Sequence, residues 1–154
     1  MIMKKNLITQ EGYDKLTKEL KELEQTQRPH VANLLKEAIE QGDLSENDAY
    51  TQAKDMQARM EMRIRELQTI LKNSQIVTKT AGDKVQVGST IKVKNPEGKT
   101  QDFMIVSAET ADPSNGKISY ESPLGKAFLG NKKGDKVKVE FPAGKKEFTI
   151  LDVA

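Results

Sequence analysis

The sequence predicts an α+β protein in which a long antiparallel helical hairpin precedes a small β domain. Apolar residues recur at gaps of three and four through the first half of the chain, and from Gly88 onward they recur in steps of two. Charged residues make up 31% of the 154 residues and aromatic residues only 5%, which suits a long solvated arm better than one compact globule. We therefore predict two domains, residues 1–77 and 78–154, with the polar segment 78–87 as a connector.

The first predicted helix runs from about Thr9 to Gln41, an arm of roughly 50 Å at 1.5 Å per residue. The Thr9 hydroxyl suits an N-cap, and Gly42 is a natural exit because glycine adopts the left-handed conformation easily. Pro29 interrupts the helix, but the apolar stripe resumes after it, so we expect a kink near Thr26 to Arg28 rather than an end. The stripe comprises Tyr13, Leu16, Leu20, Leu23, Val31, Leu34 and Ala38.

The return helix is predicted to begin near Ser45, which with Asp48 three residues on resembles a capping box. Its own apolar stripe comprises Ala49, Ala53, Met56, Met60, Ile64, Leu67 and Leu71. Two facing stripes at this spacing predict an antiparallel coiled coil with the turn at residues 42–50 as its tip.

The second half predicts a mostly antiparallel β domain of five strands, separated by turns rich in glycine, proline, asparagine and aspartate. A short helix over Leu124 to Leu129 is expected to cover one face of the sheet. The predicted strands centre on Ile91 and Val93, on Phe103 to Val106, on Ile118 and Tyr120, on Val137 to Phe141, and on Phe148 to Val153.

The predicted tip is acidic although the whole chain carries a formal net charge of +2. Asp43, Glu46 and Asp48 fall within six residues that contain no Lys, Arg or His. Acidic residues at a helix start are commonly favourable to the helix dipole and need no further role. Two carboxylates also suit a hard cation, but they are too few to hold Mg²⁺ well, so a partner would have to supply the remaining ligands.

Other classes of site are disfavoured by the composition. The chain has no Cys and a single histidine, His30, so a conventional zinc site is excluded. Ser122 has no identifiable catalytic triad. The balanced charge argues against wholesale nucleic-acid binding, so any such contact is expected to be local. No run approaches the ~20 apolar residues of a membrane span and no signal peptide is recognised, so we expect a cytoplasmic protein.

Two separated motifs resemble one family. The stretch Gly42 to Asn47 with Tyr50, following a long helix that contains Arg28-Pro29, resembles the tip signature of GreA-type transcript cleavage factors of bacterial RNA polymerase. Residues 121–130, followed by Gly134-Asp135 and residues 142–144, resemble the second signature of that family. The likeness extends from about Leu7 to Val153 and implies an antiparallel coiled coil followed by an FKBP-like domain.

The resemblance implies a DNA-binding transcription elongation factor that is not itself an enzyme. Its second domain would dock at the rim of the polymerase secondary channel while the coiled coil passes down it. Asp43 and Glu46 match the family's acidic tip residues, which help hold a second Mg²⁺ and orient the attacking water. The polymerase then hydrolyses the 3′ ends of backtracked RNA, and arrested elongation complexes resume transcription. The Mg²⁺ is shared with the polymerase rather than bound tightly by the free protein, which is expected to be a monomer with no membrane partner.

The resemblance also assigns contact residues. The polymerase-binding motif covers Glu121, Ser122, Pro123, Lys126, Ala127 and Leu129. The tip and RNA contacts cover Leu44, Ser45, Asn47, Tyr50 and Lys54. Family members often carry a basic residue where this chain has Ile39, and Arg is frequent at the position of Lys54, so we expect a weaker grip on RNA and favour the GreA type over the more basic GreB type.

Two alternative functions stay open on the sequence. A channel-binding transcription inhibitor would share the architecture, and a denser acidic tip than Asp-Leu-x-Glu-Asn would favour it. A peptidyl-prolyl isomerase is suggested by the FKBP-like domain through fold analogy alone. The second half has only five aromatic residues with which to line a proline pocket.

Overall fold

The computed structural model describes residues 5–154, which form two compact units. One unit comprises residues 13–74, and the other joins the residues up to Gly12 to residues 75–154. The segment 78–87 therefore lies within the second unit. The start of the predicted first domain, residues 1–4, lies outside the described residues.

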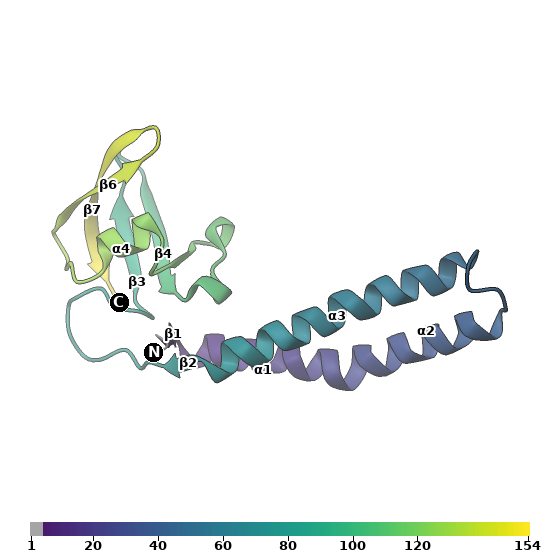
Figure 1. The fold of residues 1–154 in the computed structure, drawn as a ribbon. Helices are drawn as coiled ribbons and strands as arrows, with labels where there is room; N and C mark the ends of the chain where they lie inside the picture. The colour runs from purple at the N-terminus through teal and green to yellow at the C-terminus, as the bar shows by residue number, and fades with distance from the viewer. Residues whose placement is uncertain (1–4) are drawn as a thin grey trace. The chain divides into compact units, whose positions relative to one another are not determined.

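The outgoing arm of the hairpin consists of two α-helices joined by a π-helical turn (Figure 1). Helix α1 spans Gln10–Glu22, the π-helical turn spans Leu23–Gln27, and helix α2 spans Arg28–Glu40. The Thr9 hydroxyl accepts a hydrogen bond from the Gly12 amide at 3.1 Å, which confirms Thr9 as the N-cap. As predicted, the helix continues past Pro29 instead of ending there.

The π-helical turn lies where the sequence predicts a kink. Its last hydrogen bond runs from the Arg28 amide to the Leu23 carbonyl, five residues back rather than four. The buried hydrophobic residues of this arm are Leu16, Leu23, Val31 and Ala38, so their spacing is seven, eight and seven residues. The wider turn accommodates the additional residue, and the apolar stripe keeps facing the return helix.

The return arm is a single helix, α3, which spans Asp48–Lys72 and lies beside α2 (Figure 1). The predicted start at Ser45 is wrong, because the N-cap is Asn47, whose side chain accepts from the Tyr50 amide at 3.1 Å. Ser45 instead lies in the loop, where its side chain bonds Asp43. The buried residues of α3 that face the first arm are Ala53, Met60, Ile64 and Leu67.

Two arginine side chains link the arms of the hairpin on its surface. Arg63 donates to both carboxylate oxygens of Glu19, at 2.7 and 3.0 Å, and Arg28 donates to both oxygens of Glu61, at 2.9 Å each. The pKa of Glu61 is lowered by its hydrogen bonds from Arg28. Bidentate geometry makes these pairs specific even though exposed pairs contribute little stability.

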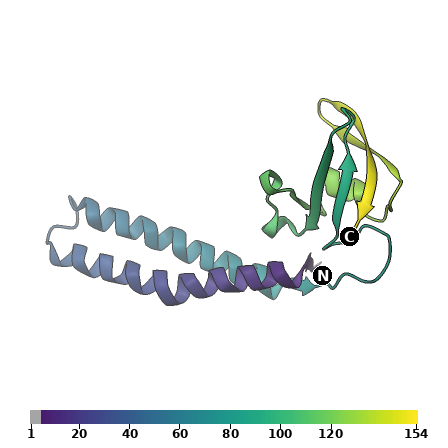
Figure 2. The same ribbon diagram turned by 180° about the vertical axis from the view of Figure 1, so that it is seen from behind.

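The second unit is built on a five-stranded sheet, as predicted (Figure 1, Figure 2). The strand order is β5-β4-β3-β7-β6, antiparallel throughout except for the parallel β4–β5 pair. Two 3₁₀ turns, at Ala108–Thr110 and Pro113–Asn115, connect β4 to β5. The strands are β3 (Thr90–Lys94), β4 (Thr100–Val106), β5 (Lys117–Ser119), β6 (Lys136–Phe141) and β7 (Gly144–Val153).

The predicted short helix is confirmed as α4, Pro123–Phe128, which covers one face of this sheet (Figure 1, Figure 2). Its Phe128 is fully buried and contacts the rings of Phe103 and Phe148, at centroid distances of 6.2 and 5.8 Å. The aromatic residues nearest the helix are thus used to build the core.

The structure also contains a two-stranded sheet that the sequence does not predict. Strand β1, Asn6–Ile8, pairs with β2, Ser74–Ile76, and the Val77 amide donates to the Ile8 carbonyl at 2.8 Å. Three-residue strands are too short to show a period of two, so no pattern marks them in the sequence.

Candidate functional site

The tip of the hairpin is a short loop, residues 41–47, between α2 and α3. The Gly42 amide donates to the Ile39 carbonyl, and Gly42 has φ = 109°, a conformation that an L side chain rarely adopts. This confirms Gly42 as the residue where the chain leaves the helix. All residues from Gln41 to Glu46 are exposed.

Asp43 is oriented by its neighbour Ser45. One carboxylate oxygen of Asp43, Oδ1, accepts both from the Ser45 hydroxyl at 2.7 Å and from the Ser45 amide at 3.0 Å. The second oxygen, Oδ2, takes no part in these two bonds. The hydrogen bond from the Ser45 side chain, followed by that from its amide, lowers the pKa of Asp43. Asp43 is therefore a carboxylate at neutral pH, held in one orientation by the loop itself.

Glu46 is exposed and, within residues 5–154, has no hydrogen-bond or ion-pair partner. It lies three residues after Asp43 on the same short loop. The tip therefore presents one oriented carboxylate and one free carboxylate to an outside partner.

Asn47 is half-buried and bonds to both helices of the hairpin. Its amide nitrogen Nδ2 donates to the Ala38 carbonyl of α2 at 2.7 Å, while its Oδ1 accepts from the Tyr50 amide of α3 at 3.1 Å. The family resemblance predicts only a contact with RNA for Asn47, and these two hydrogen bonds are not predicted from the sequence. An asparagine just before a helix signals an N-cap, but its bond to α2 depends on the folded hairpin.

The other tip residues differ in their exposure. Leu44 and Ile39 are exposed by 42% and 53%, and they give the tip an apolar component beside its acidic one. Tyr50 is half-buried, and the Lys54 Nζ lies 5.9 Å from the centre of its ring. Lys54 also donates to Gln57 Oε1 at 3.5 Å.

The carboxylates of the tip suit a hard cation only as part of a larger set of ligands. Within the part of the chain that the structure describes, there is no group of three or more His, Cys, Asp or Glu side chains that could hold a metal ion. Mg²⁺ takes six oxygen ligands, so Asp43 and Glu46 would have to share the ion with groups from outside the chain.

The second motif lies at the start of α4. Ser122 is the N-cap: its hydroxyl accepts from the Gly125 amide at 3.0 Å and donates to the Ser119 carbonyl at 2.7 Å. A Cβ at Gly125 would collide with the Ser119 carbonyl oxygen and approach its carbon to 2.9 Å, so only glycine fits there. The turn before α4 is thus fixed by its own hydrogen bonds.

Only part of the predicted polymerase-binding motif is available on the surface. Glu121, Pro123 and Lys126 are exposed around the fixed turn. Ala127 and Leu129 are half-buried and pack against the core of the sheet. The structure therefore brings a carboxylate, a proline ring and an ammonium together on one turn and directs the apolar members of the motif inward.

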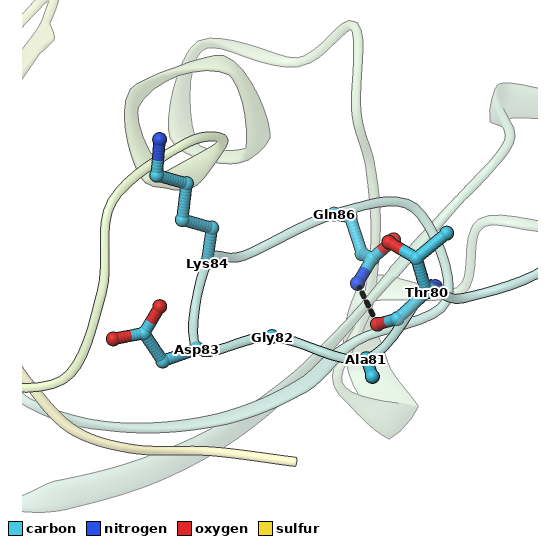
Figure 3. A pocket seen from close by; sticks show the side chains of 6 residues that line it. All are labelled: Thr80, Ala81, Gly82, Asp83, Lys84 and Gln86. Atoms are coloured by element: carbon cyan, nitrogen blue, oxygen red, sulfur yellow. Dashed lines mark hydrogen bonds between the residues drawn. The ribbon is translucent and has the colours of Figure 1, made fainter.

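A shallow hollow in the second unit lies within the loop Thr80–Gln86 (Figure 3). The Gln86 side chain closes this loop, since Nε2 donates to the Thr80 carbonyl at 2.8 Å and Oε1 accepts from the Thr80 amide at 3.0 Å. Its lining offers one carboxylate, Asp83, and one ammonium, Lys84, whose side chains extend away from the Gln86–Thr80 bonds. The hollow is best explained as the interior of a closed loop.

Among residues 5–154, no helix combines the length and the apolar character needed to cross a membrane.

Comparisons with known proteins cover nearly the whole chain. A family model described as "Transcription elongation factor, N-terminal" matches residues 6–76, and one described as "Transcription elongation factor, GreA/GreB, C-term" matches residues 79–154. The transcription elongation factor GreA of Clostridioides difficile is 44% identical over 153 residues, which are 97% of this chain and 96% of the relative. GreA of Thermotoga neapolitana is 42% identical over 153 residues, 98% of each chain. A solved structure of the transcription factor Gfh1 is 28% identical, covers 99% of both chains and has a TM-score of 0.49.

The chain consists of a helical hairpin with an acidic tip followed by a small β domain. One family model matches each of these two parts, and together they define a transcription elongation factor. The chain belongs to the GreA/GreB family.

Proposed function

We propose that this chain is a transcript cleavage factor that enters the secondary channel of bacterial RNA polymerase. There it stimulates the polymerase's Mg²⁺-dependent hydrolysis of backtracked RNA 3′ ends and so rescues arrested complexes. The observation that carries the proposal is the exposure of Asp43 and Glu46 on the loop that ends the hairpin, with too few ligands around them for a complete metal site.

The two carboxylates have different parts in this proposal. Asp43 is held by Ser45 through Oδ1 alone, so Oδ2 is the oxygen that takes no part in the bonds to Ser45. Glu46 is free to adjust to a partner. When bound between these groups and the polymerase, Mg²⁺ would supply Lewis-acid activation of water in a two-metal displacement. Because the free chain presents an incomplete site, it should have no nuclease activity of its own.

The rest of the chain places and holds the tip. The bidentate pairs of Arg63 with Glu19 and of Arg28 with Glu61 tie the two arms together along their length. Glu121, Pro123 and Lys126 are proposed to contact the polymerase, because a turn fixed by its own hydrogen bonds is suited to rigid recognition. Leu44, Tyr50 and Lys54 are proposed to lie near the RNA 3′ end, and the factor to act as a monomer.

The test is the double substitution Asp43→Asn with Glu46→Gln. It keeps the side-chain sizes and removes both charges, so the variant should melt like the parent, bind the polymerase as tightly, and stimulate almost no cleavage in backtracked complexes. Raised Mg²⁺ should restore at most part of the activity. Free RNA should stay intact with the parent protein.

A matched control removes two other charges near the same loop. Glu40 and Asp48 are both exposed, at the end of α2 and the start of α3, and Glu40→Gln with Asp48→Asn changes the net charge by the same amount. This control should cleave at close to the parental rate. A folded, polymerase-bound Asp43→Asn/Glu46→Gln variant that cleaves like the parent would refute the proposal.

A further inference from the structure

Asn47 lies where the end of α2 meets the start of α3. The first amides of α3 have no partners within the helix, and the Ala38 carbonyl near the end of α2 has one backbone partner, the Gln41 amide at 3.2 Å. The Ala38 carbonyl accepts from Asn47 Nδ2 at 2.7 Å, and the Tyr50 amide donates to Asn47 Oδ1 at 3.1 Å. One side chain therefore caps the end of one helix and the start of the next.

This double role requires an amide side chain. Asparagine has a donor and an acceptor on one rigid plane, whereas aspartate is only an acceptor and serine is shorter. Ala38, which supplies the carbonyl, is buried, and Asn47 is half-buried. Both polar atoms of the Asn47 side chain are thus used inside the protein.

The hydrogen bond between Asn47 and the Ala38 carbonyl joins the two ends of the loop that carries the acidic residues. Asp43 and Glu46 both lie between Ala38 and Asn47, and Asn47 directly follows Glu46. If the bond to Ala38 were lost, the start of α3 could separate from the end of α2, and both carboxylates would move with the loop. Small displacements of groups that hold a reacting centre reduce rates strongly.

We propose that Asn47 is a positioning residue: by joining the Ala38 carbonyl to the start of α3, it sets where Asp43 and Glu46 present their oxygens. This inference rests on the proposed function. It assigns the Asn47 side chain to the loop rather than to RNA.

The substitutions Asn47→Ser and Asn47→Asp separate its two bonds. Serine and aspartate are N-caps about as good as asparagine, so both should preserve the start of α3. Neither reproduces the bond to Ala38, because serine is too short and aspartate has no donor. The two variants differ in charge, which makes each a control for the other, and Asn33→Ser changes an exposed asparagine elsewhere on α2.

Each variant is measured in four ways: thermal melting, competition with the parent for polymerase, cleavage at saturating factor over a range of Mg²⁺ concentrations, and ¹⁵N relaxation of residues 41–46 in the free protein. We expect both Asn47 variants to melt and bind near the parent. Their maximal cleavage rate should fall by about 10- to 100-fold, with a higher Mg²⁺ requirement. Backbone motion in the loop should increase, and Asn33→Ser should change none of these.

Three results would overturn the inference. Parental cleavage and loop relaxation in Asn47→Ser would show that the bond to Ala38 is dispensable. Loss of activity in Asn47→Asp alone would show a charge effect. Weaker apparent affinity for the backtracked complex, with an unchanged maximal rate and unchanged relaxation, would show direct contact with RNA. Absence of cleavage with the parent protein would instead refute the proposed function, and the relaxation data would still test the bond.

Discussion

The π-helical turn at Leu23–Gln27 can be tested by removing one residue from it. Each residue of an α-helix turns the chain by about 100°, so seven residues return a side chain to within about 20° of its starting direction and eight leave it about 80° away. Val31 follows Leu23 by eight residues, yet both are buried. Removing the exposed Gln25 would restore a spacing of seven, and a regular α-helix could then keep the stripe in phase.

Pro29 determines the size of the effect. In the widened turn its ring is accommodated, whereas after removal of Gln25 it would lie inside a regular α-helix and cost about 3 kcal/mol. Removal of Gln25 alone should therefore lower the free energy of unfolding by about that amount. Removal of Gln25 combined with Pro29→Ala should bring it back to within about 1 kcal/mol of the parent, since both the phase and the hydrogen bonding are then regular.

Urea and thermal unfolding followed by circular dichroism would measure these differences. An alanine inserted after Gln25 is the matched control, because a spacing of nine residues turns Val31 about 180° from Leu23 in an α-helix and should remove about 1.5 to 3 kcal/mol of burial. The reasoning would be refuted if the combined variant were as unstable as the simple deletion, or if the deletion alone were harmless.

Three further predictions concern the tip and the second unit. Gly125→Ala should destabilise the second unit by about 3 kcal/mol because the new methyl group collides with the Ser119 carbonyl, and an unchanged melting temperature would contradict this. Ser45→Ala should raise the pKa of Asp43 toward its ordinary value, since it removes the stronger of two bonds to the charged form; an NMR titration of the Asp43 carboxyl that showed no upward shift would count against it. Glu121→Lys should weaken binding to polymerase without changing the melting curve, and parental affinity in a competition assay would exclude Glu121 from the docking surface.

The main elements of the fold could be predicted because periodicity determines them. The stripes of the hairpin, the five strands and α4 all appear in the spacing of apolar residues, and Thr9 and Gly42 mark helix ends through local chemistry. The π-helical turn was also encoded, since the gap of eight residues from Leu23 to Val31 departs from the spacing of seven on either side.

The candidate site could be predicted as a set of residues but not as a geometry. The acidic composition of the tip and the family resemblance located Asp43 and Glu46. The sequence predicts a helix start near Ser45, but serine and asparagine are N-cap residues of similar preference, so local propensity does not separate Ser45 from Asn47. Asn47 is selected because only it also reaches the Ala38 carbonyl, a contact that exists once the two helices are side by side. Ser45 is then free to orient Asp43.

The pairing of β1 with β2 has a consequence for the order of folding. The two strands lie roughly 65 residues apart in the chain, and closing a flexible loop of that length costs about 4 kcal/mol in entropy. Each strand has only three residues, too few to compensate for that cost. The hairpin between them brings its two ends together as its buried apolar residues pack, and pairs such as Glu19 with Arg63 and Glu24 with Gln68 then join the two arms. During synthesis, Asn6–Ile8 therefore cannot pair with β2 until the hairpin has closed. The small sheet forms late in folding, and its formation depends on the helical hairpin.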